Sequence, residues 1–321
     1  MKQTTFASLA WSAKGKVTRR ERFLAEMDAV IPWARLLALI EPHYPKAGNG
    51  RQPIGVERML RVYFLQQWFN LSDPQAEDSL YDMESMRRFA GVELGEDTVP
   101  DETTILRFRH LLERHRLTEA IFAEVRNLLE ERGLLLKSGT IVDATVITAS
   151  SSTKNEAKQR DPEMGSTKKG SNWLFGMKVH LGADPRGRAH SLTTTSAQVN
   201  DYNQMPELMH GAERELYGDR AYWSEEHRWL SREAGIRYRV NRRAKRGEKL
   251  CAYHKALNRG RSRVRAHVEH VFNVVKHLWG FTKVRYRGLA KNTARVFAAF
   301  GLANLYLVRA QLMPPGTKCH L

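Results

Sequence analysis

The chain has 321 residues, of which 42% are apolar and 27% charged, a composition typical of globular proteins with room for two domains. Its formal net charge of +17 points to a polyanionic partner, because Lys and Arg that neutralise phosphates release counterions. The longest apolar run, residues 296–308, is shorter than the ~18 residues of a membrane span, and two cysteines are too few for a disulfide framework.

The charge is unevenly distributed along the chain. Residues 1–135 contain 19 Lys and Arg against 20 Asp and Glu, whereas residues 136–321 contain 33 against 15. The two differences, −1 and +18, sum to +17, so the whole excess lies in the second part. This asymmetry predicts two segments with different roles. The first residues lack an apolar segment followed by a cleavage site, so we expect no secretory signal, no membrane contact and a cytoplasmic protein.

Residues 1–135 are predicted to form a helical domain. A capping box from Thr18 to Glu21 begins one helix, and Pro32 suits the first turn of the next. Apolar residues then repeat at helical spacing in the segments 56–69, 76–89 and 100–112. The last segment and the residues after it carry Arg107, Arg109, Arg114 and Arg116. We place these arginines on its exposed faces, where they either contact DNA or are simply solvated.

After Gly133 the periodicity changes to that of strands. The stretch TIVDATVI, residues 140–147, is β-branched and apolar on both faces, which predicts a central strand. The Ser- and Lys-rich residues 150–171 are predicted to be a mobile loop, and two strands joined by the turn DPRG follow. Further on, the patterns predict a helix at 206–210, a strand at 215–218, a helix at 224–234, a strand at 236–240 and a helix at 262–278. The expected fold class is α/β, a mixed sheet flanked by helices.

The last of these helices carries one acid, Glu269, in a strongly basic region. Five apolar residues recur at spacings of 4, 3, 4 and 3 and predict one buried stripe: Val264, Val268, Val271, Val275 and Leu278. Glu269 lies on the adjacent face with Arg265 and Lys276, so it is expected to flank the core. An exposed Arg265–Glu269 pair would stabilise the helix by only about 0.3 kcal/mol, a weak reason for the arrangement.

Two other carboxylates occupy positions that would bring them near Glu269. Asp143 lies within the apolar central strand, and Asp219 directly follows the strand at 215–218. Three converging carboxylates repel one another, and Mg²⁺ with its preference for oxygen ligands would remove that repulsion. A pair of Mg²⁺ ions is suited to phosphoryl transfer. Each acid also has a structural interpretation: Asp143 as a hydrogen-bond acceptor, Asp219 as a helix cap and Glu269 as an ion-pair partner. From spacing alone, both interpretations stay open.

Four weaker signals have mainly structural interpretations. Asp201 is expected to cap a helix, and His180 to be a satisfied core histidine. Trp223 and Trp279 are candidates for stacking on DNA bases, although core packing is favoured for both.

Several motifs resemble, in order and spacing, those of DDE transposases of the bacterial insertion-sequence-five family, the InsH-like group. They include IVDATVI, TKKG, FGMKVHLGAD, GDRAY and RVRAHVEHVFNVVK, and, nearer the N-terminus, SLYDMESMRRFAGVEL and PDETTILRFRHLLE. The resemblance covers nearly the whole chain. It implies an RNase H-like catalytic domain over residues 136–312, preceded by the helical domain 1–135 for transposon-end binding or dimerisation, and followed by a tail at 313–321.

The resemblance also implies the site residues. It assigns the three catalytic acids to Asp143, Asp219 and Glu269, as ligands of two Mg²⁺ ions that Mn²⁺ can replace. The C-terminal signature of the family maps onto Arg265, Glu269 and Lys276, while Ser262 stands at the position of its tyrosine. DNA contacts are expected from Arg265, Lys276, Arg242, Arg243, Lys245, Arg246, Lys283, Arg285 and Arg287.

The implied reaction is hydrolysis at the ends of an insertion sequence, which exposes a 3′-hydroxyl, followed by attack of that hydroxyl on target DNA. The expected partners are double-stranded DNA, both terminal inverted repeats and target, and a second copy of the chain in a homodimer on DNA. Two alternatives remain: an RNase H-like nuclease without strand transfer, and a DNA-binding protein without catalysis.

Overall fold

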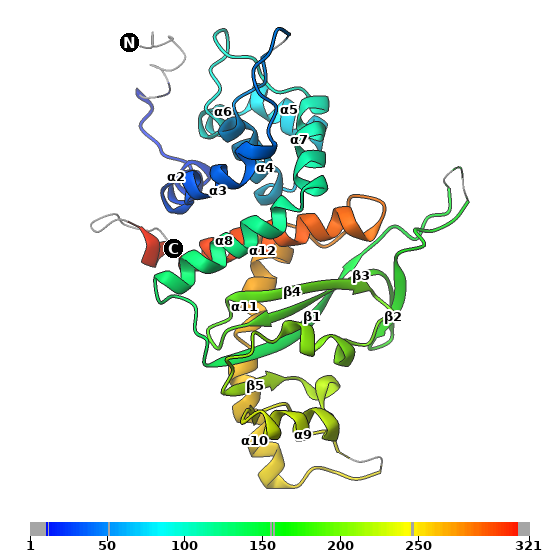
Figure 1. Ribbon diagram of the computed structural model, residues 1–321. Helices are drawn as coiled ribbons and strands as arrows, with labels where there is room; N and C mark the ends of the chain where they lie inside the picture. Colours follow the sequence, from blue (N-terminus) through cyan, green and yellow to red (C-terminus); the bar gives the residue numbers. More distant parts are fainter. Residues whose placement is uncertain are drawn as a thin grey trace.

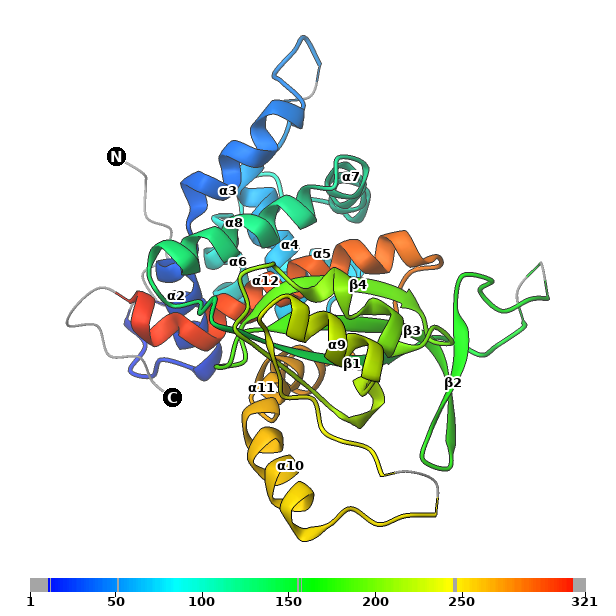
Figure 2. The ribbon, with the colours of Figure 1, turned by 60° about the horizontal axis from the view of Figure 1, so that its bottom comes forward.

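A computed structural model describes residues 11, 13–50, 52–154, 156, 158–244 and 247–313. It contains a helical region followed by a six-stranded sheet flanked by helices. The long helices α8 (Leu117–Glu131) and α12 (Leu289–Leu312) lie between the two in both views (Figure 1 and Figure 2). The predicted tail at 313–321 lies outside the described residues, apart from Met313.

Seven helices of the helical region lie within the described residues. They are α2 (Arg19–Val30), α3 (Trp33–Ile40), α4 (Val56–Trp68), α5 (Asp73–Asp82), α6 (Glu84–Ala90), α7 (Glu102–Arg114) and α8. The capping box predicted at Thr18 is confirmed: its side chain accepts from the backbone of Glu21, whose carboxylate accepts from the backbone of Thr18. The side chains that these helices bury against one another form one core with part of the sheet.

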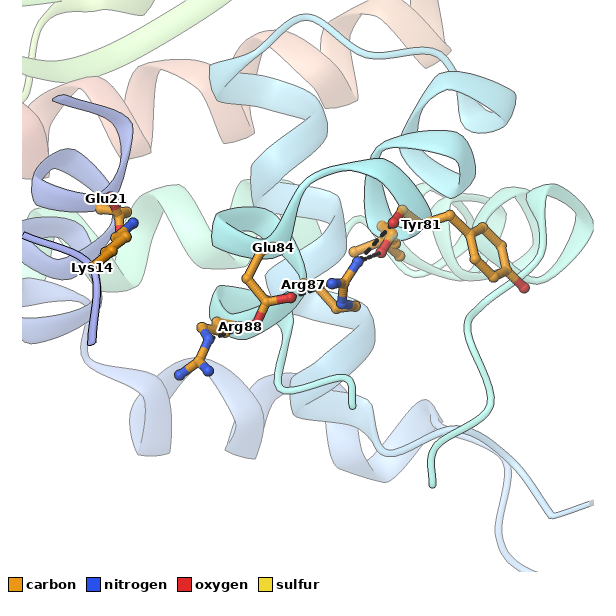
Figure 3. Close-up of polar contacts among 7 residues, drawn as sticks. Lys14, Glu21, Tyr81, Glu84, Arg87 and Arg88 are labelled. Carbon is orange, nitrogen blue, oxygen red and sulfur yellow. Dashed lines mark hydrogen bonds and ion pairs between the residues drawn. The ribbon is translucent and has the colours of Figure 1, made fainter. Parts of the chain in front are cut away.

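The single helix predicted over residues 76–89 is instead two helices, α5 and α6. Met83 between them adopts an extended backbone with ψ of 99°. Arg87 of α6 donates to the main-chain oxygens of Leu80 (3.0 Å) and Tyr81 (2.7 Å), which α5 leaves unpaired at its end, and also pairs with Glu84 (Figure 3). A side chain from the next helix thus caps α5, a contact that apolar spacing does not reveal.

The sheet has the mixed topology expected of an RNase H-like domain. Its strands are β1 (Gly139–Thr148), β2 (Gly165–Lys169), β3 (Asn172–Ala183), β4 (Ala189–Ser196), β5 (Glu215–Gly218) and β6 (Arg237–Tyr238). Strand β1 pairs with β3 in antiparallel and with β5 in parallel orientation, β4 pairs with β3, and β6 extends the sheet beyond β5. The predicted fold class is therefore confirmed.

The loop predicted over residues 150–171 is wrong for its last part. Residues 165–169 form β2, which pairs with the start of β3 in a hairpin that extends away from the body of the sheet (Figure 2). Gly165 lets the start of β2 lie against the end of β4, because a Cβ there would lie 2.2 Å from the Ser196 hydroxyl. Backbone pairing compensates for the lack of apolar side chains.

Between β4 and β6 the chain forms mainly short elements. They are the 3₁₀ turns η2 (Asp201–Gln204), η3 (Pro206–Leu208) and η4 (Arg220–Tyr222), and helix α9 (Glu225–Glu233). The strand predicted at 215–218 is confirmed as β5, and the helix predicted at 224–234 as α9. The predicted helix at 206–210 shortens to η3.

The helix predicted over residues 262–278 is not continuous. Helix α10 (Ala252–Arg265) ends before α11 (Val268–Asn273), and a π-helical turn, η5 (Val274–Leu278), follows. At the break, the β3–β4 turn packs against His267. The Nδ1 atom of His267 lies 2.6 Å from the Pro185 oxygen. A Cβ on Gly187 would lie 2.1 Å from the carbonyl oxygen of His267. The predicted stripe fails at Leu278, which is 55% exposed.

Helix α12 joins the two parts of the molecule. It packs against α2, α4, α7 and α8 on one side and against β4 and α11 on the other. Arg309 near its end forms a buried ion pair with Glu26 of α2, with 3.0 Å between Nε and Oε2. The apolar run at 296–308 is thus a buried helix, as predicted, and none of the described helices is long and apolar enough to cross a membrane.

Candidate active site and nucleic-acid interface

The three predicted acids line one cleft of about 390 Å³. Asp143 lies on β1, Asp219 directly follows β5, and Glu269 lies on α11. The parallel pairing of β1 with β5 sets Val142 opposite Gly218, so the next residues, Asp143 and Asp219, emerge side by side. The convergence therefore follows from strand register and from the packing of α11 against β1.

Asp143 is the most buried of the three acids. Burial raises the pKa of its carboxyl from 3.8 to about 6, against the attraction of Arg265, and the negative charges of Asp219 and Glu269 add to the rise. The Arg265 guanidinium donates to Oδ2 at 2.7 Å, and the backbone of Ala144 donates to Oδ1 at 2.8 Å. Burial therefore outweighs the attraction of Arg265 at this carboxyl.

The other two acids have different surroundings. Asp219 caps η4, since its Oδ1 accepts from the backbone of Ala221 at 2.8 Å, so its structural interpretation is confirmed without excluding a second role. Glu269 is exposed at the cleft rather than shielded beside the core, and forms no ion pair within the described part of the chain. The proposed pairing of Glu269 with Arg265 is wrong, because Arg265 binds Asp143 instead.

The donor chemistry of the cleft fits a hard divalent cation. All three acids offer carboxylate oxygens, and mutual repulsion contributes to the raised pKa of Asp143. Among the residues that the structure describes, however, no group of three or more His, Cys, Asp or Glu side chains is arranged so that it could hold a metal ion. The three acids line the same cleft, and the positive charge next to Asp143 in this structure is the Arg265 guanidinium.

The predicted DNA-contacting residues fall into two groups. Some are held by the protein itself: Lys276 donates to Thr145 Oγ1 (3.0 Å) and to the Val146 oxygen (3.1 Å), and Arg285 donates to the Asn70 main-chain oxygen (2.6 Å). Arg242 approaches His254, with 2.7 Å between Nη1 and Nε2. Arg243, Lys283 and Arg287 are exposed, while Lys245 and Arg246 lie outside the described residues.

The four arginines placed on exposed faces of the helical region also divide. Arg109 is buried, where it pairs with Asp73 and Glu113 and lies 4.1 Å from the ring centre of Tyr286, so its predicted exposure is wrong. Arg116 is exposed but pairs with Glu119. Arg107 and Arg114 are exposed as predicted. Nothing in the sequence around Arg109 indicated that this side chain would pair with Asp73.

Sequence reasoning missed part of the cleft wall. Lys178 of β3 is buried and pairs with Asp201 at 2.9 Å, and both line the cleft with Tyr222. The cap predicted for Asp201 is made by Asn200, whose Oδ1 accepts from the backbone of Tyr202. The signal for Lys178 was its place two residues before His180 on one strand, which sets both side chains on the same face.

His180 lies in the core as expected, but it is not the satisfied histidine that was predicted, because its Nδ1 has no hydrogen-bond partner among the described residues. The two tryptophans have the packing role favoured for them. His180 is fully buried, its Nε2 lies 2.8 Å from the Thr195 hydroxyl, and burial lowers its pKa to about 4. Trp279 is 4% exposed and packs against Tyr306, and Trp223 packs against Tyr238. Neither ring is presented openly for base stacking.

Comparison with known proteins gives two family matches. Residues 11–111 match the model described as Transposase domain (DUF772), and residues 135–305 match the Transposase DDE domain. Among solved structures, the crystal structure of the Mos1 strand transfer complex matches at 14% identity, with a TM-score of 0.27, over 84% of this chain and 79% of that chain. A TM-score this low supports no structural argument. The DDE domain model alone spans more than half of the chain, and this protein therefore belongs to the DDE transposase family.

Proposed function

We propose that this transposase cuts DNA at the ends of an insertion sequence of the insertion-sequence-five family, InsH-like group, and joins the exposed 3′-hydroxyl to target DNA. The observation that supports this most directly is the convergence of Asp143, Asp219 and Glu269, from three separate elements, on one cleft. Simple DNA binding needs none of these acids, and two of them add to the unfavourable charge on the third.

DDE transposases use divalent metal ions. We assign Asp143, Asp219 and Glu269 as the residues that hold two Mg²⁺ ions, with Mn²⁺ as a possible substitute. When bound, the ions would polarise the phosphate and activate the attacking oxygen. The protein's own contribution is to bring the three carboxylates to one cleft.

Two basic residues position the acids. Lys276 reaches across from η5 to the β1 residues Thr145 and Val146, which ties the helical segment of Glu269 to the strand of Asp143. Arg265 balances the charge of Asp143 in the DNA-free protein. We propose that Arg265 turns to a DNA phosphate once another cation replaces it at Asp143.

Exposed basic residues would bind the DNA backbone around the cleft. Arg243, Lys283 and Arg287 are exposed, and α10 adds Lys255, Arg259 and Arg263 without burying any of its residues. Phosphate contacts of this kind do not depend on sequence and weaken as salt rises. Because two transposon ends must be brought together before joining, we propose that the active form is a homodimer on DNA.

The test is cleavage, in Mg²⁺, of a labelled duplex that carries the terminal repeats flanking the coding sequence. The variants are Asp143→Asn, Asp219→Asn and Glu269→Gln, with DNA binding measured alongside. Each variant is expected to bind DNA but to lose at least about 1,000-fold in cleavage rate, because each removes a charge needed in the transition state. Glu248→Gln is the matched control, since Glu248 is the exposed acid of the same basic region.

Cleavage that persists in Glu269→Gln would contradict the assignment of the third acid. A wild-type protein that cuts but cannot join a 3′-hydroxyl end to a plasmid target would instead be a nuclease. A protein that binds the terminal repeats without cutting them would support the non-catalytic alternative.

A further inference from the structure

Among the described residues, three side chains that line the cleft have a buried polar atom without a hydrogen-bond partner: Asp201, Tyr222 and Arg265. Asp201 pairs with Lys178 and Arg265 with Asp143, so Tyr222 is the one of these three described residues without any ion-pair or hydrogen-bond partner for its side chain. Tyr222 is 1% exposed and lines the cleft together with Asp143, Asp219 and Glu269. Within the described residues, its hydroxyl has no hydrogen-bond partner. Buried polar groups nearly always have partners, and an unmet one destabilises the folded protein. An acceptor for this hydroxyl is therefore expected to arrive from outside the protein.

The ring that carries the hydroxyl is firmly held. Tyr222 ends η4, the turn that Asp219 caps, and its carbonyl oxygen accepts from the Tyr238 hydroxyl at 2.8 Å. Its ring lies in a small core cluster with Val142, Met205, Leu208, Leu216 and Val240. Gly218 leaves room for it, since a Cβ there would lie 3.3 Å from Cβ of Tyr222 and 3.1 Å from Val142.

The hydroxyl lies among the carboxylates of the cleft. Burial raises the pKa of Tyr222 well above its ordinary value, and the negative charges of Asp201, Asp143 and Asp219 raise it further. The hydroxyl therefore keeps its proton at neutral pH. It is a neutral donor in a fixed position, beside the acids assigned to catalysis.

We propose that the Tyr222 hydroxyl donates a hydrogen bond to a non-bridging oxygen of the phosphodiester that is cut, which makes Tyr222 a fourth catalytic residue. This inference rests on the proposed function. No acceptor of the described residues forms a hydrogen bond with the Tyr222 hydroxyl, whereas a bound phosphate would bring one. The non-bridging oxygens of that phosphate gain negative charge during the reaction. A donor that needs no rearrangement stabilises such charge efficiently.

The experiment uses the full-length protein with Tyr222→Phe, which removes only the hydroxyl. The matched control is Tyr217→Phe on the neighbouring strand, whose hydroxyl donates to Glu215 rather than into the cleft. Single-turnover cleavage of the labelled terminal-repeat duplex is measured with DNA affinity and the unfolding midpoint. We expect Tyr222→Phe to cut about 100-fold more slowly, with unchanged affinity and an unfolding midpoint at least as high as that of the wild type. Tyr217→Phe should cut at the normal rate.

A second measurement separates contact with the phosphate from an indirect effect. Each non-bridging oxygen of the scissile phosphate is replaced in turn by a methyl group, as the two methylphosphonate stereoisomers. On the stereoisomer that lacks the accepting oxygen, the wild type and Tyr222→Phe should cut at the same rate. On the other stereoisomer, the wild type should still cut faster than Tyr222→Phe. An equal difference on both would overturn the proposal, as would normal cleavage by Tyr222→Phe, which would mean that a water molecule satisfies the hydroxyl. If the wild type itself does not cut, the proposed function fails and this inference with it.

Discussion

Arg61 and Arg109 of the helical region contrast with Arg259 and Arg263 of α10. In the helical region, Arg61 pairs with both Asp28 and Glu57, and Arg109 pairs with Asp73 and Glu113. On α10, Arg259 and Arg263 are exposed and form no ion pair with any described residue. The first 135 residues are close to neutral overall, whereas the remainder carries the whole excess of positive charge.

This difference separates scaffolding from binding. Paired charges in the helical region hold helices against one another. Because each positive charge is balanced by a nearby acid, these pairs attract a distant polyanion only weakly. Unpaired charges beside the cleft attract phosphate and cost stability through mutual repulsion. The helical region is consequently less suited to unspecific binding than its number of arginines suggests, and any reading of transposon ends there depends on a few exposed side chains such as Arg107 and Arg114.

The largest effect is expected where the two regions meet. Asn70, which follows α4, accepts through Oδ1 from Arg295 (2.6 Å) and Arg285 (3.0 Å), and its Nδ2 donates to the Gly280 oxygen (3.2 Å). Asn70→Ala should lower the free energy of unfolding by about 4 kcal/mol, because two guanidinium groups lose an acceptor. Urea unfolding measures this. Asn70→Asp keeps the acceptors and should stay close to the wild type; equal losses in both variants would show that the arginines do not matter.

The next effect concerns Asp143 and depends on pH. Its folded-state pKa of about 6 lies above the ordinary 3.8, so its protonated form favours the folded state. The contribution of protonated Asp143 to the free energy of unfolding is complete below pH 4. It falls as the pH rises towards 6 and is absent above pH 6. Asp143→Asn, which resembles the protonated acid, should therefore be more stable than the wild type by about 3 kcal/mol at pH 8, and equal to it near pH 3.5. Thermal unfolding across this range, without divalent cations, is the measurement, and a less stable variant at pH 8 would contradict it.

A smaller effect tests the comparison of the two regions directly. Replacing Arg259 and Arg263 by Gln should weaken DNA binding about tenfold at physiological salt and reduce the dependence on salt by roughly two ions. The matched change, Arg107→Gln with Arg114→Gln, removes the same charge from the helical region. If that change weakens unspecific binding equally, the contrast between the regions disappears. If it weakens binding only to terminal repeats, the helical region reads the transposon ends.

The smallest effect is expected at an exposed pair of the helical region. Arg116 and Glu119 are three residues apart at the start of α8, and the arginine is largely exposed. Such pairs add little to stability. Arg116→Ala should leave the unfolding midpoint unchanged within error, and a clear decrease would show that even solvated pairs support the helical scaffold.

Short sequence patterns predicted those structural features that depend on neighbouring residues. The capping box at Thr18 and the strand β5 were readable because turn chemistry and alternation each concern short stretches of sequence. The break between α10 and α11 was not, because the turn that packs against it lies about 80 residues earlier. For the same reason sequence gave Arg265 the wrong partner: its neighbour in the helix was visible, and Asp143, 122 residues away, was not.

The position of α12 has a consequence for synthesis on the ribosome. Helices α2, α4, α7 and α8 all pack against this last helix, and Glu26 of α2 finds its buried partner, Arg309, near its end. The helical region is therefore synthesised before α12, but its core is complete only when α12 packs against it. Termination before α12 would leave a helical region with exposed apolar surface rather than a free DNA-binding fragment, so an active transposase appears only after α12 has been made.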